Sequence, residues 1–447
     1  MTTPTQFVDL IRVSLSEIDL SEVVSIQPQA CTSFHKLIEI YRQDMSVTQS
    51  LEDCLAICMA THLAVALEGD PLWIYLVGAP SSGKSTICEL IASDEIHTRS
   101  LSKFTGLVSG SRQGTHLIPM LQGKCVVIKD GTLLLESSQQ QLANVYGELR
   151  DIFDGSLNAE YRNGVSASFS NISFGMVIGI TERIYSLNMS ALGERFLHCR
   201  LDTSRDVEVD RNSRAIDSIF QSAARTNLEG NEAGDSRSFP KQRAYTAGLL
   251  SHLHTRIRNE EILRPGYTQS DKSLIQAIGD VIACSRAQAP RVREHGSPSE
   301  LLYDASPEGS TRVVKQLSRL ALCLCYVLSE TRITPRIRSL LIKVGKDTSY
   351  GRQFNIISTI AKSKGLNRQS IAALCNIPLE TISRRIDDLE SLGILTTDSE
   401  THRPARGRSV PHLHCNPYIK DAFLKVLNEN PNRPNPRPKP RPRTSGG

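Results

Sequence analysis

Residues 75–86 read Tyr75-Leu76-Val77-Gly78-Ala79-Pro80-Ser81-Ser82-Gly83-Lys84-Ser85-Thr86, and this stretch decides the fold that we expect. An apolar run, Leu72 to Val77, leads into it, and a helix-like run, Thr86 to Ile91, follows it. The two glycines allow the backbone to curl around phosphate oxygens. The N–H groups of the loop and of the helix N-terminus favour an anion. The spacing G-x-x-x-x-G-K-S therefore predicts a strand, a phosphate-binding loop and a helix; a glycine-rich turn without a ligand is the alternative.

The loop contains the residue types that a nucleoside triphosphate site needs. Lys84 is expected to reach the β- and γ-phosphates, and the Ser85 hydroxyl is expected to ligate Mg²⁺. The expected cofactors are therefore ATP and Mg²⁺. The expected nucleotide-binding residues are Gly78, Ala79, Pro80, Ser81, Ser82, Gly83, Lys84, Ser85 and Thr86.

Length and composition place the chain among ordinary soluble proteins. With 447 residues it should contain two or three domains. Hydrophobic residues make up 39% and charged residues 22% of the chain. The longest apolar run, Leu320 to Leu328, is shorter than the ~20 residues of a membrane span. The N-terminus lacks a basic-then-apolar signal pattern. We therefore expect a cytoplasmic protein without a membrane partner.

The eleven cysteines form no C-x-x-C pair. Cys54, Cys58, Cys323 and Cys325 lie in apolar helical stretches. The simplest interpretation is that these cysteines are core thiols in a reducing cytosol. The alternative is that they bind zinc. The net charge of +5 is mild, but residues 431–447 contain five Lys or Arg residues and no acid.

Hydropathy and turn signals divide the chain into segments of different character. Apolar strands alternate with helices in the second segment, as in a parallel α/β sheet. The expected strands are Leu72–Val77, Cys125–Ile128, Gly175–Ile180 and Phe196–Leu201. The predicted segments are an N-terminal helical extension (1–70), an α/β core (71–204), a flexible insertion (205–240), a second helical region (241–348), a C-terminal unit (349–429) and a disordered Pro/Arg-rich tail (430–447).

An acid follows the second expected strand, in the sequence Lys129-Asp130-Gly131. The Asp130 carboxylate would lie beside the phosphate-binding loop and hold Mg²⁺ or its waters. Many P-loop ATPases place two acids here, but Gly131 follows, so one acid serves the metal, the water or both. Glu136 and Glu148 are nearby in sequence, and nothing assigns the missing role to either. The alternative is a strand that ends in a capping aspartate.

Two further polar residues flank expected strands. Thr181 directly follows Gly175–Ile180, where a polar side chain can sense the γ-phosphate or orient the attacking water. Arg195 precedes the last apolar run, a placement that suits an arginine reaching the γ-phosphate of a neighbouring subunit. The alternative for Arg195 is a structural arginine that pairs with Glu194 or a neighbouring acid.

A β-hairpin is expected before the third strand, because Asn163-Gly164 is a strong hairpin-turn signal. Arg162 would lie near the tip of this hairpin. In a ring-shaped motor the tip would touch DNA in the central pore. A surface hairpin with no partner is equally compatible with the sequence.

The order of these motifs resembles that of the AAA+ ATPases. The resemblance rests on the loop Gly78 to Ser85, Asp130, Thr181 and the box Leu192-Gly193-Glu194-Arg195-Phe196. This box is similar to that of the minichromosome-maintenance helicases, and the whole set looks closest to self-loading helicases of phages and mobile elements. Ser310 to Leu317 looks like the sensor-2 helix of the same group. By this resemblance Arg312 would contact the nucleotide from a helical lid (241–348), and the chain would form a hexamer-like homo-oligomeric ring.

The C-terminal unit contains a short helix, a turn, a longer helix and the start of a strand. This order predicts a winged helix-turn-helix, and it resembles the C-terminal domains of bacterial regulators and replicative ring ATPases. A domain that only docks proteins is the alternative, and Asp387, Asp388 and Glu390 weaken a simple base-reading role. The residues expected to contact DNA phosphates are Arg384 and Arg385 of the longer helix and Arg403, Arg406 and Arg408 of the wing.

The sequence therefore predicts an α/β P-loop NTPase of the AAA+ type with a C-terminal winged helix. Lys84, Asp130, Thr181, Arg195 and Arg312 are the expected catalytic residues, and Ser85 with Asp130 the expected Mg²⁺ ligands. The first functional hypothesis is an ATP-driven DNA motor, a replicative-type helicase or replication initiator. The second is a nucleotide-switched protein, a helicase loader or DNA-bound regulator, that assembles on ATP without unwinding DNA.

Overall fold

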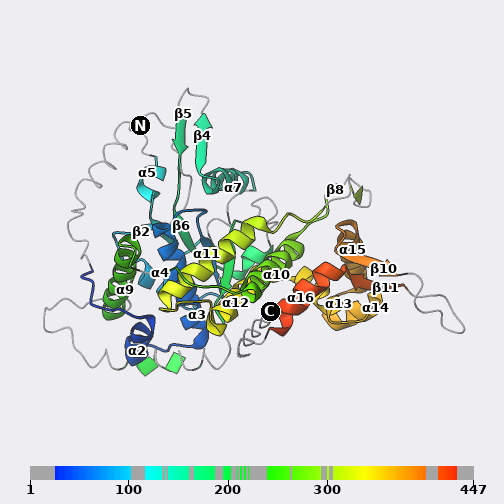
Figure 1. Ribbon diagram of the computed structural model, residues 1–447. Coiled ribbons are helices and arrows are strands. Elements are labelled where there is room, and N and C mark those ends of the chain that lie inside the picture. Colours follow the sequence, from blue (N-terminus) through cyan, green and yellow to red (C-terminus); the bar gives the residue numbers. More distant parts are fainter. Residues whose placement is uncertain are drawn as a thin grey trace, which may run out of the picture.

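The strand that precedes Gly78 lies inside a five-stranded parallel sheet with the order β2-β3-β6-β1-β7 (Figure 1). The strands span Trp73–Val77 (β1), Thr98–Leu101 (β2), Cys125–Ile128 (β3), Gly175–Ile180 (β6) and Leu197–Arg200 (β7). The α/β class and the four expected strands are confirmed. β2 was not expected, because its sequence Thr-Arg-Ser-Leu at the sheet edge has no apolar run.

The computed structural model describes residues 26–101, 116–132, 139–160, 166–186, 195–202, 239–261, 264–292, 306–398 and 411–429, with isolated positions in some of the gaps. Four residues that were expected to contact DNA, Arg162, Arg403, Arg406 and Arg408, lie outside the described residues. Most of the expected insertion at 205–240 and the tail at 430–447 also lie outside them.

The side chains of β1 alternate between two hydrophobic clusters, one on each face of the sheet. Ile74 and Leu76 belong to the larger cluster, and Trp73, Tyr75 and Val77 belong to the smaller one. Successive side chains of a strand point to opposite faces, so a strand covered on both sides must be apolar throughout. This explains why β1 is a continuous apolar run in the sequence.

Helices cover the face of the sheet that faces the larger cluster. α12 contacts the edge strand β7. The helices also pack on one another, since α11 contacts α3, and α9 contacts α4 and α2. The expected helical regions before and after the α/β segment are both present, and their buried apolar residues share one cluster with the sheet. The helices are α2 (Phe34–Asp44), α3 (Gln49–Leu63), α4 (Lys84–Ile91), α9 (Pro240–Arg258), α10 (Gln269–Arg286), α11 (Thr311–Val327) and α12 (Pro335–Thr348).

The other face of the sheet contacts α7 (Gln139–Phe153), α5 (Ile118–Leu121) and the base of a hairpin. The hairpin strands β4 (Ser156–Glu160) and β5 (Ser166–Ser170) are antiparallel and extend away from the sheet beside α7 (Figure 1). The predicted hairpin is therefore confirmed, while its tip at 161–165 lies outside the described residues.

The C-terminal unit contains the predicted helices and strand. Asn367 caps α14 through its side chain, and Asn376 in the left-handed conformation ends that helix, so α15 starts after a short turn. β10 and β11 are antiparallel, and α16 packs against α10. The elements are α13 (Arg352–Ala361), α14 (Arg368–Cys375), α15 (Leu379–Ser391), β10 (Leu395–Asp398), β11 (His412–Cys415) and α16 (Pro417–Asn428).

Three smaller observations complete the fold. A short antiparallel pair, β8 (Arg291–Val292) and β9 (Glu300–Leu301), lies between α10 and α11. All eleven cysteines are free thiols, and all except Cys375 are buried, as expected for core residues. Among the described helices, none has the length and apolar character that crossing a lipid bilayer would require.

Candidate functional site

The glycine-rich loop adopts a conformation that depends on its glycines. Gly83 has φ +94° and directly precedes α4, and Ser81 also has a positive φ, +60°. A Cβ atom on Gly78 would lie 2.6 Å from the Oγ of the buried Ser82, so no larger residue fits there. Within the described residues, no side chain caps the start of α4. The first N–H groups of this helix therefore remain available to an anion.

The Lys84 ammonium lies within the curve of the loop. Its Nζ donates hydrogen bonds to the carbonyl oxygens of Gly78, at 2.8 Å, and Ala79, at 2.6 Å. Partial burial lowers the pKa of Lys84, and the nearby charge of Asp130 opposes this effect. The amine therefore occupies the concave side of the loop, where the phosphates of a nucleotide were expected.

The strand order brings three separate segments of the sequence to one edge of the sheet. β6 lies between β1 and β3, so the residues after these strands are neighbours. Gly78 N donates to Ile180 O at 3.1 Å, and Gly131 N donates to Gly179 O at 2.7 Å. The loop, Thr181 and Asp130 thus meet at the carboxyl ends of adjacent parallel strands, which is where open α/β sheets bind ligands.

Asp130 and Thr181 have properties that suit a site for Mg²⁺ and phosphate. Asp130 is exposed, and hydrogen bonds from the side chain and backbone of Thr132 lower the pKa of its carboxyl, so it is ionised at neutral pH. The Thr181 Oγ1 is buried and has no hydrogen-bond partner among the described residues. A buried hydroxyl without a partner costs about 1–3 kcal/mol. The residues present therefore fit Mg·ATP, whose phosphate oxygens would satisfy this hydroxyl.

The structure explains why the strand β3 is followed by a single acid. A Cβ atom on Gly131 would lie 2.5 Å from the Cγ2 of Ile178 and 3.3 Å from the carbonyl oxygen of Gly179. Ile178 is a buried core residue of β6 and cannot move away without disturbing the sheet. Position 131 therefore has no room for a carboxylate side chain.

We expect the substitution Gly131→Glu to lower the free energy of unfolding by about 1–3 kcal/mol, because it overpacks the interface between β3 and β6. Chemical denaturation followed by circular dichroism measures the loss. Gly147→Glu on α7 is the matched control, since a Cβ atom there meets no heavy atom within 4 Å. A Gly131→Glu protein as stable as the control would show that this position accepts a second acid.

A charged network next to the site was not recognised in the sequence. Arg200 at the end of β7 pairs with Glu182, which directly follows Thr181, at 2.8 Å. The Arg200 Cζ also lies 3.9 Å from the ring centroid of Tyr350, between α12 and α13. This network links the candidate nucleotide site to the start of the C-terminal unit. The available signal was a charged residue within the expected strand Phe196–Leu201.

The structure gives Arg195, the arginine expected to reach a neighbouring subunit, contacts within its own chain. This residue is only 6% exposed, and its Nη2 donates to the Asp154 carboxylate of the same chain at 2.8 Å. Its guanidinium also lies over the Phe153 ring. In this structure Arg195 does not project from the surface. The alternative interpretation, a structural arginine paired with an acid, agrees with these contacts.

Arg312, which was expected to contact the nucleotide from the helical lid, lies close enough to Arg195 to influence its charge. Arg195 precedes β7, whose Leu197 pairs with Ile74, so Arg195 lies at the amino edge of the sheet. Gln316, one turn after Arg312 on α11, donates to the Arg195 carbonyl at 2.7 Å. The backbone of Arg195 is therefore about 20 Å from the glycine-rich loop, at about 3.3 Å for each of six strand residues. Arg312 instead pairs with Glu308 at 2.8 Å.

The expected DNA-contacting residues of α15 are exposed, and the acids of this helix are paired. Arg384 and Arg385 are exposed, and within the described part of the chain neither forms an ion pair. Arg368 of α14 pairs with Asp387, at 2.7 Å, and with Glu390, at 3.3 Å. Asp388 pairs with Arg291 of β8. The negative charges that weakened the DNA-binding interpretation are therefore offset by arginines from other elements.

Fold and site together define an α/β protein with a five-stranded parallel sheet and a glycine-rich loop at the carboxyl edge of that sheet. A scan against protein-family models found no match to this chain, and a search of the curated proteins found no significantly similar sequence. The function is therefore inferred from the geometry of the site.

Proposed function

We propose that this chain is a P-loop ATPase of the AAA+ type whose Mg·ATP hydrolysis is coupled to DNA binding. The observation that carries the proposal is the convergence of the loop 78–86, Asp130 and Thr181 at one edge of the sheet. The Thr181 hydroxyl, which has no partner among the described residues, and the start of α4, which no described side chain caps, support it, because both can bind negatively charged oxygens of a ligand.

Each residue of the site has a proposed role. Mg·ATP would supply the phosphoanhydride bond that is cleaved. The loop N–H groups bind its phosphates, and Lys84 exchanges two carbonyl acceptors for phosphate oxygens. Ser85, exposed in the first turn of α4, and the ionised Asp130 hold the metal. Thr181 orients the attacking water or the γ-phosphate.

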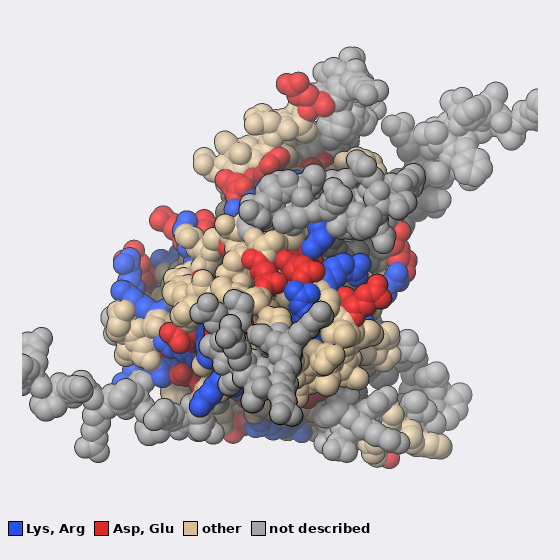
Figure 2. All heavy atoms as spheres, turned by 90° about the vertical axis from the view of Figure 1, so that its right-hand side faces the viewer, with Lys and Arg blue, Asp and Glu red and all other residues tan. Residues whose placement is uncertain are grey.

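The proposed DNA contact is local and involves α15, the longer helix of a winged helix-turn-helix. Figure 2 shows the side of the molecule where the C-terminal unit lies in Figure 1, and basic and acidic side chains are interspersed on it. A broad positive surface is therefore not what favours DNA on this side. Arg384 and Arg385 would instead bind phosphates individually, while the acids of α15 are held by Arg368 and Arg291.

We expect the double substitution of Arg384 and Arg385 by alanine to weaken duplex DNA binding and to abolish DNA stimulation of ATP hydrolysis. Loss of two phosphate contacts should reduce the slope of log affinity against log salt by about 2. Fluorescence anisotropy at several salt concentrations and phosphate release with and without DNA measure both effects. Arg256→Ala on α9 is the control. If the wild-type protein binds no DNA, the DNA part of the proposal is wrong.

A ring-shaped motor is the second candidate function, and the position of Arg195 and Arg312 favours it. Both lie at the amino edge of the sheet, so neither can serve the nucleotide of its own chain. In an assembled ring the two arginines would lie on the side of each subunit that is opposite to that subunit's own loop 78–86, and so toward the loop of a neighbouring subunit. The ion pair between Arg195 and Asp154 would have to open for this role. A nucleotide-switched regulator needs no such opening.

Substitution of Arg195 and of Asp154 by alanine separates the two candidates. If Arg195 and Asp154 are only a structural ion pair, replacing either residue should lower the free energy of unfolding by about 1–3 kcal/mol, and ATP hydrolysis should be retained. In a ring motor, Arg195→Ala alone should reduce turnover by about 10³–10⁵-fold. We expect the structural result. Strand displacement by the wild-type protein, together with selective loss of turnover in Arg195→Ala, would instead establish the motor.

A further inference from the structure

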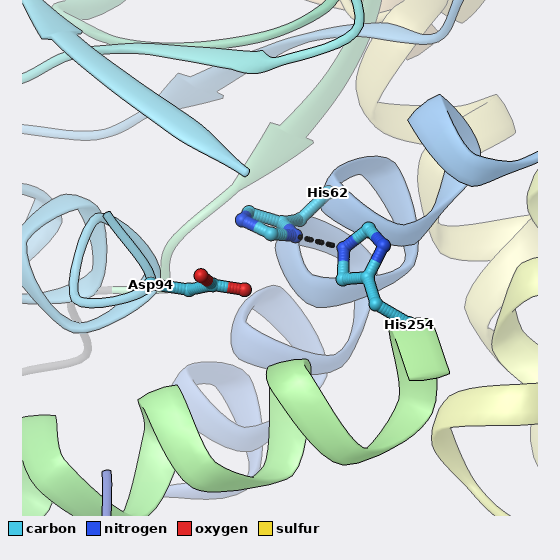
Figure 3. A group of neighbouring side chains, drawn as sticks. All are labelled: His62, Asp94 and His254. Atoms are coloured by element: carbon cyan, nitrogen blue, oxygen red, sulfur yellow. Dashed lines mark hydrogen bonds between the residues drawn. The ribbon is translucent and has the colours of Figure 1, made fainter. Parts of the chain in front are cut away.

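Three buried polar side chains meet between α3, the turn after α4, and α9. They are His62, Asp94 and His254, which are 0%, 4% and 2% exposed (Figure 3). One ligand atom from each residue lies within 4.8 Å of the others. Ionisable groups are rarely buried unless they are paired or bind a metal. The proposed ATPase uses none of these residues.

Hydrogen bonds fix the orientation of the His62 ring. Its Nε2 lies 2.7 Å from the Thr98 hydroxyl, which itself donates to the Ile91 carbonyl. The Thr98 oxygen therefore accepts the Nε2 proton, and the lone pair of His62 is on Nδ1 (the tautomer is assigned from these bonds). That Nδ1 lies 3.0 Å from His254 Nε2 (Figure 3). Metal-binding histidines typically have the other ring nitrogen held in this way.

The carboxylate of Asp94 and the ring of His254 are both held by His97. His97 Nδ1 lies 2.8 Å from Asp94 Oδ2, and its ring stacks on that of His254 with centroids 3.8 Å apart. Burial opposes ionisation of Asp94, but the hydrogen bond from His97 and the nearby imidazoles outweigh it and lower the pKa of the carboxyl. Burial lowers the pKa of His62 to about 4 and that of His254 to about 2. Two buried imidazoles thus face a buried carboxyl group.

We propose that His62 Nδ1, His254 Nε2 and an Asp94 carboxylate oxygen bind a divalent first-row cation, with Zn²⁺ the best fit. Imidazole and carboxylate ligands both suit Zn²⁺. Two ligands at about 2.0–2.1 Å from a tetrahedral zinc are about 3.3–3.4 Å apart. The 3.0 Å between the two imidazole nitrogens therefore has to open by a few tenths of an ångström, and the Asp94 oxygen, which lies within 4.8 Å of both nitrogens, has to move closer. The cation would also offset the buried negative charge of Asp94.

The proposed metal has a structural role and lies away from the nucleotide site. Asp94 follows α4, the helix that starts at the phosphate-binding loop, and Lys84 is at the opposite end of that helix. Eight helical residues span about 12 Å. A cation at this position would connect the C-terminal end of α4 to α3 and α9. It would therefore stabilise the fold whether or not ATP is bound.

The test uses the full chain without a polyhistidine tag, stripped of metal by a chelator and titrated with Zn²⁺. The thermal midpoint should rise by roughly 3–5 °C at a hundredfold excess over Kd, with saturation at one ion per chain. His254→Gln and Asp94→Asn should lose this shift. His252→Gln, on the same helix but outside the cluster, should keep it. A Zn²⁺-dependent shift that persists in His254→Gln would overturn the proposal.

A second measurement covers the possibility that a variant does not fold. Co²⁺ added to the metal-free wild-type chain should produce visible ligand-field absorption at one equivalent, and Zn²⁺ should remove it. If neither ion changes the wild-type protein, the cluster is a hydrogen-bonded part of the core and the proposal is wrong. Both results are independent of ATPase activity.

Discussion

ATP hydrolysis by the Lys84→Ala protein is expected to be slower than wild type by about 10²–10³-fold or more, with the fold retained. The reason is the position of the ammonium, which is the one cation on the concave side of the loop in the described part of the site. It stands within hydrogen-bond distance of the Gly78 and Ala79 carbonyls. Its removal deletes a preorganised positive charge where negative charge develops during phosphoryl transfer.

Steady-state phosphate release with saturating Mg·ATP measures this loss, and thermal unfolding reports on the fold. Little stability should be lost, because Lys84 is only partly buried and bonds to its own loop. Lys36→Ala, an exposed position on α2, is the matched control. Hydrolysis at the wild-type rate in Lys84→Ala would mean that the loop 78–86 is not the catalytic site.

Trp73→Ala is expected to lower the free energy of unfolding by about 3–5 kcal/mol. Trp73 starts the strand that leads into the phosphate-binding loop, and it is completely buried. Its ring packs against Phe153, Phe174 and Phe196, with centroids 5.1, 5.8 and 5.1 Å away. Its Nε1 donates to the Phe174 carbonyl at 2.9 Å. The alanine would leave a large cavity between the sheet and α7 and remove this hydrogen bond.

Urea denaturation followed by circular dichroism is the appropriate measurement, because Trp73 is the single tryptophan and its fluorescence is lost with it. Trp73→Phe is the conservative control. It keeps a ring in the cluster but leaves the Phe174 carbonyl without its donor, at a cost of about 1–3 kcal/mol. A loss below about 1 kcal/mol in Trp73→Ala would show that the site relaxes around the smaller residue.

Much of the candidate site could be predicted from local sequence. The loop 78–86 was recognised because its residues are consecutive, and the loop conformation follows from Gly78 and Gly83. Asp130 and Thr181 were recognised because each follows an apolar strand. To place these two residues beside the loop, the strands also had to be assumed parallel and adjacent. The structure shows this arrangement, with β6 between β3 and β1.

Two features of the site depend on contacts that the sequence does not reveal. Arg195 lies next to Glu194 in the sequence, but it pairs with Asp154, which is 41 residues away. Position 131 is a glycine because Ile178 of the adjacent strand fills the space beside it. In each case the partner comes from an element that is adjacent only after the sheet has formed.

The amino-acid sequence by itself determined the α/β class, the glycine-rich loop between β1 and α4, the hairpin and the order of helices in the C-terminal unit. These features follow from hydropathy period and turn residues, which act over a few neighbouring positions. Only the tertiary structure decided the burial of Arg195 and the meeting of His62 with His254, 192 residues apart. Such contacts depend on how whole elements pack, and packing joins residues whose separation along the chain is not encoded in any local pattern.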